Sequence, residues 1–110
     1  MISMKNFRTL SQAKKDIETL QKKIEQNQQY IALIENYNPQ TFTQHVIHEY
    51  AHEGNLIRTA ENLNRLGHQI DGRNIEKQDI STIIQSRPDP DDLLHKEVRR
   101  LYLKKIRSRS

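Results

Sequence analysis

Residues 45–54, HVIHEYAHEG, are the residues of this sequence whose types and spacing most clearly suggest chemistry. The letters HEYAH within them fit H-E-x-x-H, the signature of zinc peptidases. On a helix, His48 and His52 lie one turn apart on the same face, where two imidazoles can bind Zn²⁺ while Glu49 polarises a bound water. His45, one turn earlier, could offer a third nitrogen ligand.

The surroundings of this motif do not complete a peptidase site. The longer signature requires Gly seven residues after the first His and a third His three residues later, and Asn55 and Arg58 occupy those positions. Glu61 could serve as a downstream acidic ligand, but it lies one predicted helix away. Zinc peptidases also bind the substrate strand along a sheet edge, and no strand pattern is present here. We therefore expect these histidines to line a scaffold helix, with no bound metal and no cofactor.

Composition limits how this chain can fold. Apolar residues make up 34% of its 110 residues and the mean hydropathy is -0.93. So polar a chain cannot form one large core, and it must bury its apolar stripes in extended helices or against another subunit. Cysteine is absent, which excludes disulfides and thiolate metal sites. Neither a membrane-spanning segment nor a signal peptide is recognisable, so we expect a cytoplasmic protein without membrane contact.

Residues 1–37 form the first predicted domain, a coiled-coil helix from about Asn6 to Tyr37. It has no Gly or Pro, and its apolar residues repeat every three and four positions. We expect this stripe to form a homodimer, and packing against the chain's own C-terminal helix is the alternative. With position a set at the first leucine, the predicted dimerisation residues are Leu10, Ala13, Ile17, Leu20, Ile24, Asn27, Ile31 and Ile34.

Residues 38–88 form the second predicted domain, a helical unit. Its helices are expected at about residues 39–53, 56–66 and 75–86, with a turn at Asp71-Gly72. The residues expected to cap these three helices at their N-termini are Asn38, Asn55 and Asn74. Pro39 would occupy the first position of the first of these helices.

The third predicted domain, residues 89–110, is a C-terminal helix with a basic tail. We expect it to open at Asp89-Pro90, with acidic residues facing the positive end of the helix dipole. The net charge of the chain is +4, and residues 99–110 contain six basic and no acidic side chains. That layout is typical of an arm that binds a polyanion, although a solvated terminus is an open alternative.

Residues 55–88 contain the packing pattern of a helix-turn-helix, with a small residue in the first helix and isoleucines in the second. The string TAENLNRLGHQIDGRNIEKQDISTIIQSRP is similar to the DNA-binding segment of large serine recombinases. The string EYAHEGNLIRTAENL resembles small terminases and other phage helix-turn-helix proteins. Both resemblances cover about a third of the chain. They imply DNA binding only, because a chain of 110 residues is too short to contain the recombinase catalytic domain as well.

The predicted DNA-binding residues fall into three groups. If the helix at 75–86 enters a major groove, the side chains directed away from its isoleucines are Lys77, Gln78, Ser81, Thr82 and Gln85. The residues expected to contact phosphates at the edges are Arg58, Arg73 and Arg87. Those of the tail are Arg99, Arg100, Lys104, Lys105, Arg107 and Arg109. Against this assignment, Glu76 and Asp79 lie on the same helix and would repel phosphate if they faced it.

We therefore expect an all-α protein with a long N-terminal coiled-coil helix, a small helix-turn-helix unit and a basic C-terminal helix. The function predicted first is a small protein that binds double-stranded DNA as a dimer, either a regulator or a phage or mobile-element accessory protein. The second hypothesis is a coiled-coil interaction module that captures a protein partner without DNA. The third is a minimal zinc metallopeptidase acting through the HEYAH residues.

Overall fold

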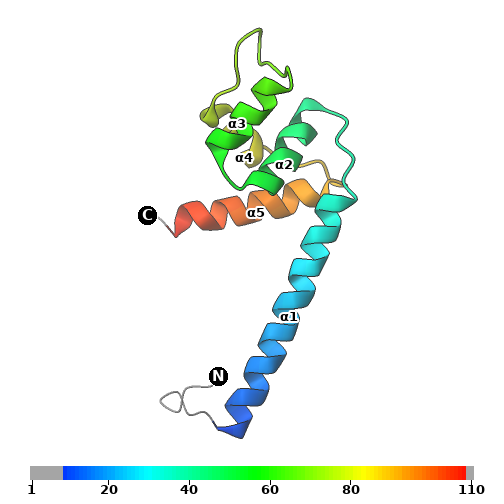
Figure 1. Ribbon diagram of the computed structural model, residues 1–110, viewed down its shortest axis with the longest axis vertical. Helices are drawn as coiled ribbons and strands as arrows, with labels where there is room; N and C mark the ends of the chain where they lie inside the picture. The colour runs from blue at the N-terminus through cyan, green and yellow to red at the C-terminus, as the bar shows by residue number, and fades with distance from the viewer. Residues whose placement is uncertain (1–8, 109–110) are drawn as a thin grey trace. The chain divides into compact units, whose positions relative to one another are not determined.

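The computed structural model describes residues 9–108, and this part of the chain is all-helical, as expected (Figure 1). Residues 9–108 contain no strand, and an isolated β-bridge joins Ile70 and Arg73. None of the described helices is both long and apolar enough to cross a membrane. The five helices are α1 (Leu10–Glu35), α2 (Phe42–Glu53), α3 (Leu56–Arg65), α4 (Lys77–Gln85) and α5 (Leu93–Arg107).

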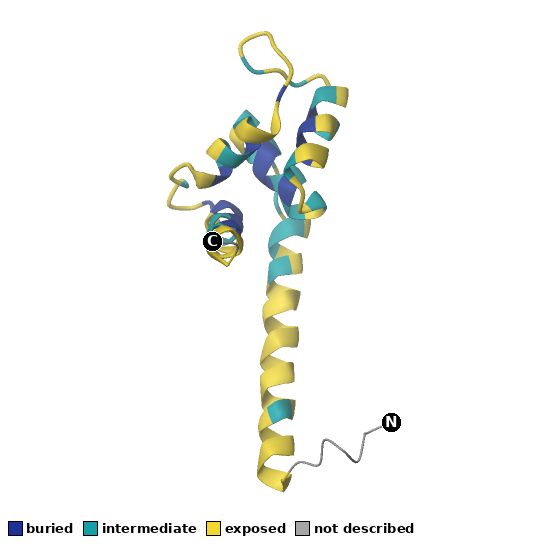
Figure 2. Ribbon diagram, turned by 90° about the vertical axis from the view of Figure 1, so that its left-hand side faces the viewer, coloured by how far each residue is buried: buried dark blue, intermediate teal, exposed yellow. Residues whose placement is uncertain are grey.

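The chain divides into two compact units, Met1–Ala32 and Leu33–Ser110. The first unit is built on α1, whose last three residues belong to the second. None of the 26 residues of α1 is buried, and Figure 2 shows the helix exposed along most of its length. The predicted long N-terminal helix is therefore present, and it begins at Leu10, after Thr9, and ends at Glu35, two residues before the predicted end. Residues 6–8 of the predicted span lie outside the described residues.

The exposed surface of α1 includes the predicted apolar stripe. Exposed fractions of its large apolar side chains run from 51% at Ile31 to 73% at Leu10. Ile34 is half-buried because it lies within the second unit. An apolar stripe without a covering partner contributes little to the stability of a helix in water.

The second unit is a small helical bundle. The helices α2, α3 and α4 each pack on the other two, and α5 packs on α2 and α4. Tyr50 and Tyr102 meet edge to face, with ring centroids 5.9 Å apart. The aliphatic core residues, each at most 1% exposed, are Val46, Ile47, Leu63, Ile80, Ile84, Leu94 and Val98.

The start of α2 differs from the prediction. Asn38 and Pro39 do not open a helix, which begins instead after Thr41. The Thr41 hydroxyl accepts a hydrogen bond from the backbone N–H of Gln44, and the Gln44 side chain accepts one from the Thr41 N–H, both at 3.2 Å. This reciprocal capping box satisfies two N–H groups that an Asn38 cap would leave unpaired. Gly54 ends α2 in the left-handed conformation, φ 65°, which glycine adopts without steric cost.

The connection from α3 to α4 contains the predicted turn at Asp71-Gly72. Both residues have positive φ, 52° and 76°, and Ile70 and Arg73 exchange backbone hydrogen bonds of 3.0 and 2.9 Å across them. This is the geometry of a two-residue type I′ turn. The predicted cap Asn74 is wrong, because α4 begins after Glu76, whose N–H donates to the Asp79 carboxylate at 2.8 Å.

The start of α5 also lies later than predicted. Asp92, not Asp89, is the N-cap, and α5 begins at Leu93. The Asp92 carboxylate accepts from the N–H of His95 at 2.9 Å and from the Tyr37 hydroxyl at 2.7 Å. Burial and this hydrogen bond raise the pKa of Tyr37 well above its usual value. The contact ties the segment after α1 to the start of α5, across 55 residues of sequence.

Side chains of α5 satisfy the C-terminal carbonyls of α4. The buried ring of His95 donates from Nε2 to the carbonyl of Ile84 at 3.1 Å. Arg99 donates from Nε to the carbonyl of Gln85 at 3.1 Å. The last carbonyls of a helix have no partner within it, and a cationic side chain there also opposes the negative end of the helix dipole. These contacts fix α4 against α5.

Candidate nucleic-acid interface

The exposed face of α4 carries most of the side chains predicted to contact DNA bases. Gln78, Thr82 and Gln85, at positions i, i+4 and i+7, are all exposed, whereas Ile80 and Ile84 on the other side are fully buried. The helix thus presents a line of neutral hydrogen-bonding side chains on a rigidly packed support.

Ser81 lies next to this line, one turn before Gln85, at the edge that faces α5. Its hydroxyl is half-buried and lies 2.7 Å from the Tyr102 hydroxyl of α5. The side-chain amide of Gln85 donates to the same Ser81 oxygen at 3.0 Å. Ser81 therefore contributes to the packing of α4 on α5, and its hydroxyl group is already hydrogen-bonded within the protein.

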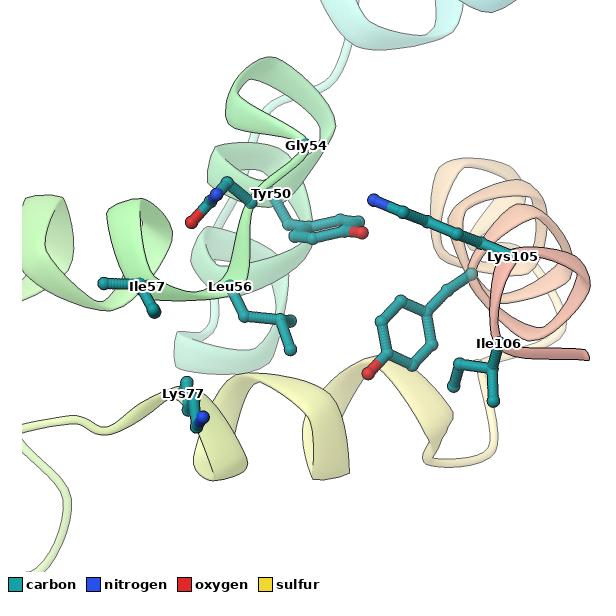
Figure 3. A pocket seen from close by; sticks show the side chains of 9 residues that line it. Tyr50, Gly54, Leu56, Ile57, Lys77, Lys105 and Ile106 are labelled. Atoms are coloured by element: carbon teal, nitrogen blue, oxygen red, sulfur yellow. The ribbon is translucent and has the colours of Figure 1, made fainter. Parts of the chain in front are cut away.

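A small recess of ≈ 210 Å³ lies where the α2–α3 turn, the start of α4 and the end of α5 meet (Figure 3). Apolar side chains line it, including Ile57 and Ile106, which are 54% and 40% exposed. Lys77 of α4 and Lys105 of α5 also line it. Neither ammonium group is in a salt bridge with another described residue. The fold thus places two cations that are 28 residues apart in sequence on opposite sides of one recess (Figure 3).

The first turn of α3 borders the same recess. Asn55 caps this helix by accepting from the N–H of Arg58 at 3.0 Å, and Leu56 and Ile57 follow it along the recess. The first N–H groups of a helix have no acceptor within it, and the positive end of the helix dipole lies there. The two lysines and the positive end of the α3 dipole thus lie around this recess, and Arg58, the residue after Ile57, is exposed.

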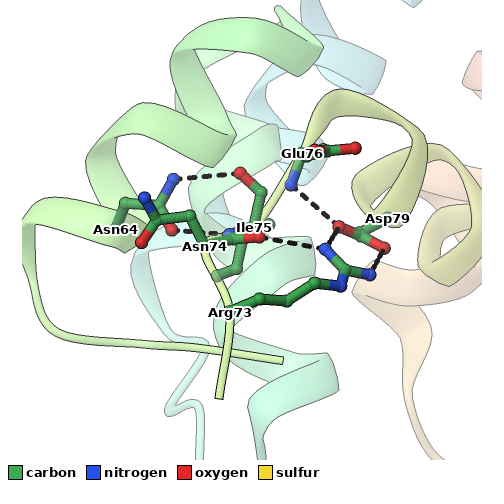
Figure 4. Close-up of polar contacts among 6 residues, drawn as sticks. All are labelled: Asn64, Arg73, Asn74, Ile75, Glu76 and Asp79. Carbon is green, nitrogen blue, oxygen red and sulfur yellow. Dashed lines mark hydrogen bonds and ion pairs between the residues drawn. The ribbon is translucent and has the colours of Figure 1, made fainter. Parts of the chain in front are cut away.

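The carboxylate of Asp79 is neutralised by Arg73, as Figure 4 shows. The guanidinium donates to both carboxylate oxygens, at 2.8 and 2.9 Å. These bonds, with the N–H of Glu76, lower the pKa of Asp79 to about 2. The expected repulsion between Asp79 and phosphate is thereby reduced, but the Arg73 guanidinium is partly engaged within the protein.

Asn64 holds the segment before α4 in place (Figure 4). Its side-chain oxygen accepts from the backbone N–H of Ile75 at 2.7 Å, and its amide donates to the carbonyl of Ile75 at 2.9 Å. This residue was not predicted from the sequence. An asparagine in the last turn of α3, next to the connection, is the only signal there, and its partner becomes visible only in the fold.

The predicted cations of α5, and of the segment before it, have different environments. Arg99 binds the carbonyl of Gln85, and Arg100 pairs with Glu97 one turn earlier. Four of the other predicted cations in this part of the chain are exposed: Arg87, Lys104, Lys105 and Arg107. Arg109 lies outside the described residues.

The residues of the H-E-x-x-H motif contact different neighbours. The Nε2 of His48 lies 3.2 Å from the carbonyl of Ile34, and its ring meets that of His52 edge to face. The Glu49 carboxylate accepts from the side-chain amide of Asn62 at 2.9 Å. Among residues 9–108, no three His, Cys, Asp or Glu side chains are grouped so that they could hold a metal ion.

Comparisons with known proteins identify no relative of this chain. Neither family models, curated proteins nor solved structures include a match to the chain.

Proposed function

We propose that this chain is a small protein that binds double-stranded DNA, with α4 as its recognition helix. The observation that carries this proposal is the exposed line Gln78, Thr82 and Gln85 on a helix whose opposite face is buried. Glutamine amides form paired hydrogen bonds with adenine in the major groove, and threonine contacts bases or phosphates. In this proposal α2, α3 and α4 act as a helix-turn-helix unit of a dimeric regulator or mobile-element accessory protein.

Phosphate contacts come from the cations beside this helix. Lys77 and Lys105 lie at one recess near the N-terminus of α3, where a phosphate would meet two ammonium groups and the positive end of a helix dipole. Arg58 and the exposed cations of α5 would add further phosphate contacts. Dimerisation through α1 would raise the affinity by joining two such units.

A salt titration of binding to random-sequence duplex DNA tests the proposal. We expect the logarithm of the binding constant to fall linearly with the logarithm of the salt concentration. The double variant Lys77→Gln/Lys105→Gln removes two proposed phosphate contacts, so the slope should decrease by about two. The matched control is Lys14→Gln/Lys22→Gln on α1, which removes the same charge and leaves the slope nearly unchanged. Absence of binding at low salt refutes the proposal.

A coiled-coil interaction module without DNA binding is the second candidate. The observation in its favour is the exposed apolar stripe of α1, which no described residue of the first unit covers. The two candidates differ in one measurement, since the interaction module would dimerise or capture a helix normally while failing to bind duplex DNA at any salt concentration.

A further inference from the structure

We infer that α1 pairs with α1 of a second copy of this chain as a parallel, in-register coiled coil in which Asn27 faces Asn27. This inference deepens the dimerisation that belongs to the proposed function. Its two supports are the exposure of the stripe and the position of its single polar residue.

The stripe needs a partner helix of its own shape. Leu10, Ile17, Leu20, Ile24 and Ile31 are each more than half exposed and follow one heptad seam. Three of the four a positions are isoleucine, a β-branched residue, and one of the four d positions, Leu20, is leucine. Isoleucine at a with leucine at d favours two strands in a parallel arrangement. A second copy supplies an identical seam of identical length.

Asn27 excludes the antiparallel arrangement. It occupies a d position, and in antiparallel pairs each d residue faces an a residue of the partner. All the a residues of this helix are Leu or Ile. Every antiparallel register would therefore bury the Asn27 amide against an aliphatic side chain, with its donors and acceptor unsatisfied.

Asn27 also selects one register among the parallel ones. In a parallel pair, each d residue faces a d residue. A shift by one heptad would place Asn27 against Leu20 or Ile34, whereas the unshifted pair places it against the same residue of the partner. A side-chain amide is both donor and acceptor, so two facing amides can satisfy each other. Such a polar pair defines orientation and register at some cost in stability.

The flanking residues are compatible with this register. In a parallel pair, a g residue approaches the e residue five positions later in the partner. No two like charges face each other there, since the pairs are Asp16 with Gln21, Lys23 with Gln28, and Tyr30 with Glu35.

Disulfide trapping of the full chain, without DNA, tests the inference, because the protein has no cysteine of its own. Ala13→Cys places a thiol at a d position, where two parallel in-register helices bring the sulfur atoms within bonding range. The control is Lys15→Cys on the outer face of the same turn. We expect Ala13→Cys to form a covalent dimer under mild oxidation, and Lys15→Cys to form it several-fold more slowly.

A second variant tests the role of Asn27. Asn27→Leu in the Ala13→Cys protein should tighten the dimer and lower the yield of covalent dimer, because antiparallel and shifted pairs become possible. If the protein is a dimer in sedimentation but the Ala13→Cys variant links no faster than the Lys15→Cys variant, the inference is overturned and dimerisation is left intact. An unchanged yield in Asn27→Leu overturns the role of Asn27, and a monomer at high concentration overturns both. Rapid linking without any DNA binding supports this inference and refutes only the proposed function.

Discussion

Replacing Asn64 by alanine should destabilise the second unit, because this side chain holds the segment that leads into α4. It makes two hydrogen bonds to the backbone of Ile75, a residue that is only 3% exposed. Loss of each bond costs about 1–1.5 kcal/mol, because the backbone groups left behind cannot all reach water. Alanine regains about 0.5 kcal/mol as the better helix former in α3. The expected net decrease in the free energy of unfolding is about 2 kcal/mol.

Asn74→Ala is the matched control, because the same atoms are removed from a residue ten positions away. Asn74 is exposed, and its side chain makes no hydrogen bond to another described residue. We expect the free energy of unfolding of this variant to lie within about 0.5 kcal/mol of that of the parent. If Asn74 were the cap of α4, as its sequence position suggests, the order of the two effects would be reversed.

Urea unfolding followed by the near-ultraviolet signal of the tyrosines measures both variants, three of the four tyrosines lying in the second unit. For a unit of this size, a loss of about 2 kcal/mol also lowers the melting temperature by about 10 °C. An Asn64→Ala protein as stable as the parent, or an Asn74→Ala protein that loses as much, would refute the reasoning.

Three further measurements follow from the structure. The pKa of Asp79 in the folded state, about 2, is below its value in the unfolded chain. The stabilisation by Arg73 is therefore present above about pH 5 and is lost as the pH falls toward 2. Over that pH range, the melting temperature of the Asp79→Asn variant should change less than that of the parent. Tyr37→Phe leaves one oxygen of the buried Asp92 without its hydroxyl donor and should cost about 1–3 kcal/mol in urea unfolding, and an unchanged midpoint would contradict the contact. Because His48 faces a backbone carbonyl, a chelator should leave the melting temperature unchanged, and zinc found in stoichiometric amount would revive the peptidase hypothesis.

Spacing along the chain was sufficient to predict the helices and the buried face of α4. Ile80 and Ile84 are buried as their separation indicates, and Gln78 and Thr82 are exposed on the other side. A helical period distinguishes a buried face from an exposed one, but it does not show which exposed residue a later helix will cover. The burial of Ser81 against Tyr102 was therefore not predictable.

The helix starts were predicted less well, because capping depends on which of several polar side chains reaches the free N–H groups. Thr41 and Gln44 have the spacing of a capping box, yet Asn38-Pro39 is an equally familiar local signal. Hydrogen bonds between residues far apart in sequence are harder still to predict from the sequence. The partner of Asn64 is 11 residues away and that of Tyr37 is 55 residues away, across connections whose course the sequence does not define.

The contacts that α5 makes with the end of α4 have a consequence for the order of folding during synthesis. With 9 residues, α4 is shorter than the length at which an isolated helix is stable in water. His95 and Arg99, which satisfy its final carbonyls, are added to the chain only after α4 itself has been made. On the ribosome, α4 therefore gains these two C-terminal contacts only after α5 has emerged. Until then, the packing of α4 on α2 and α3 is what holds it in place.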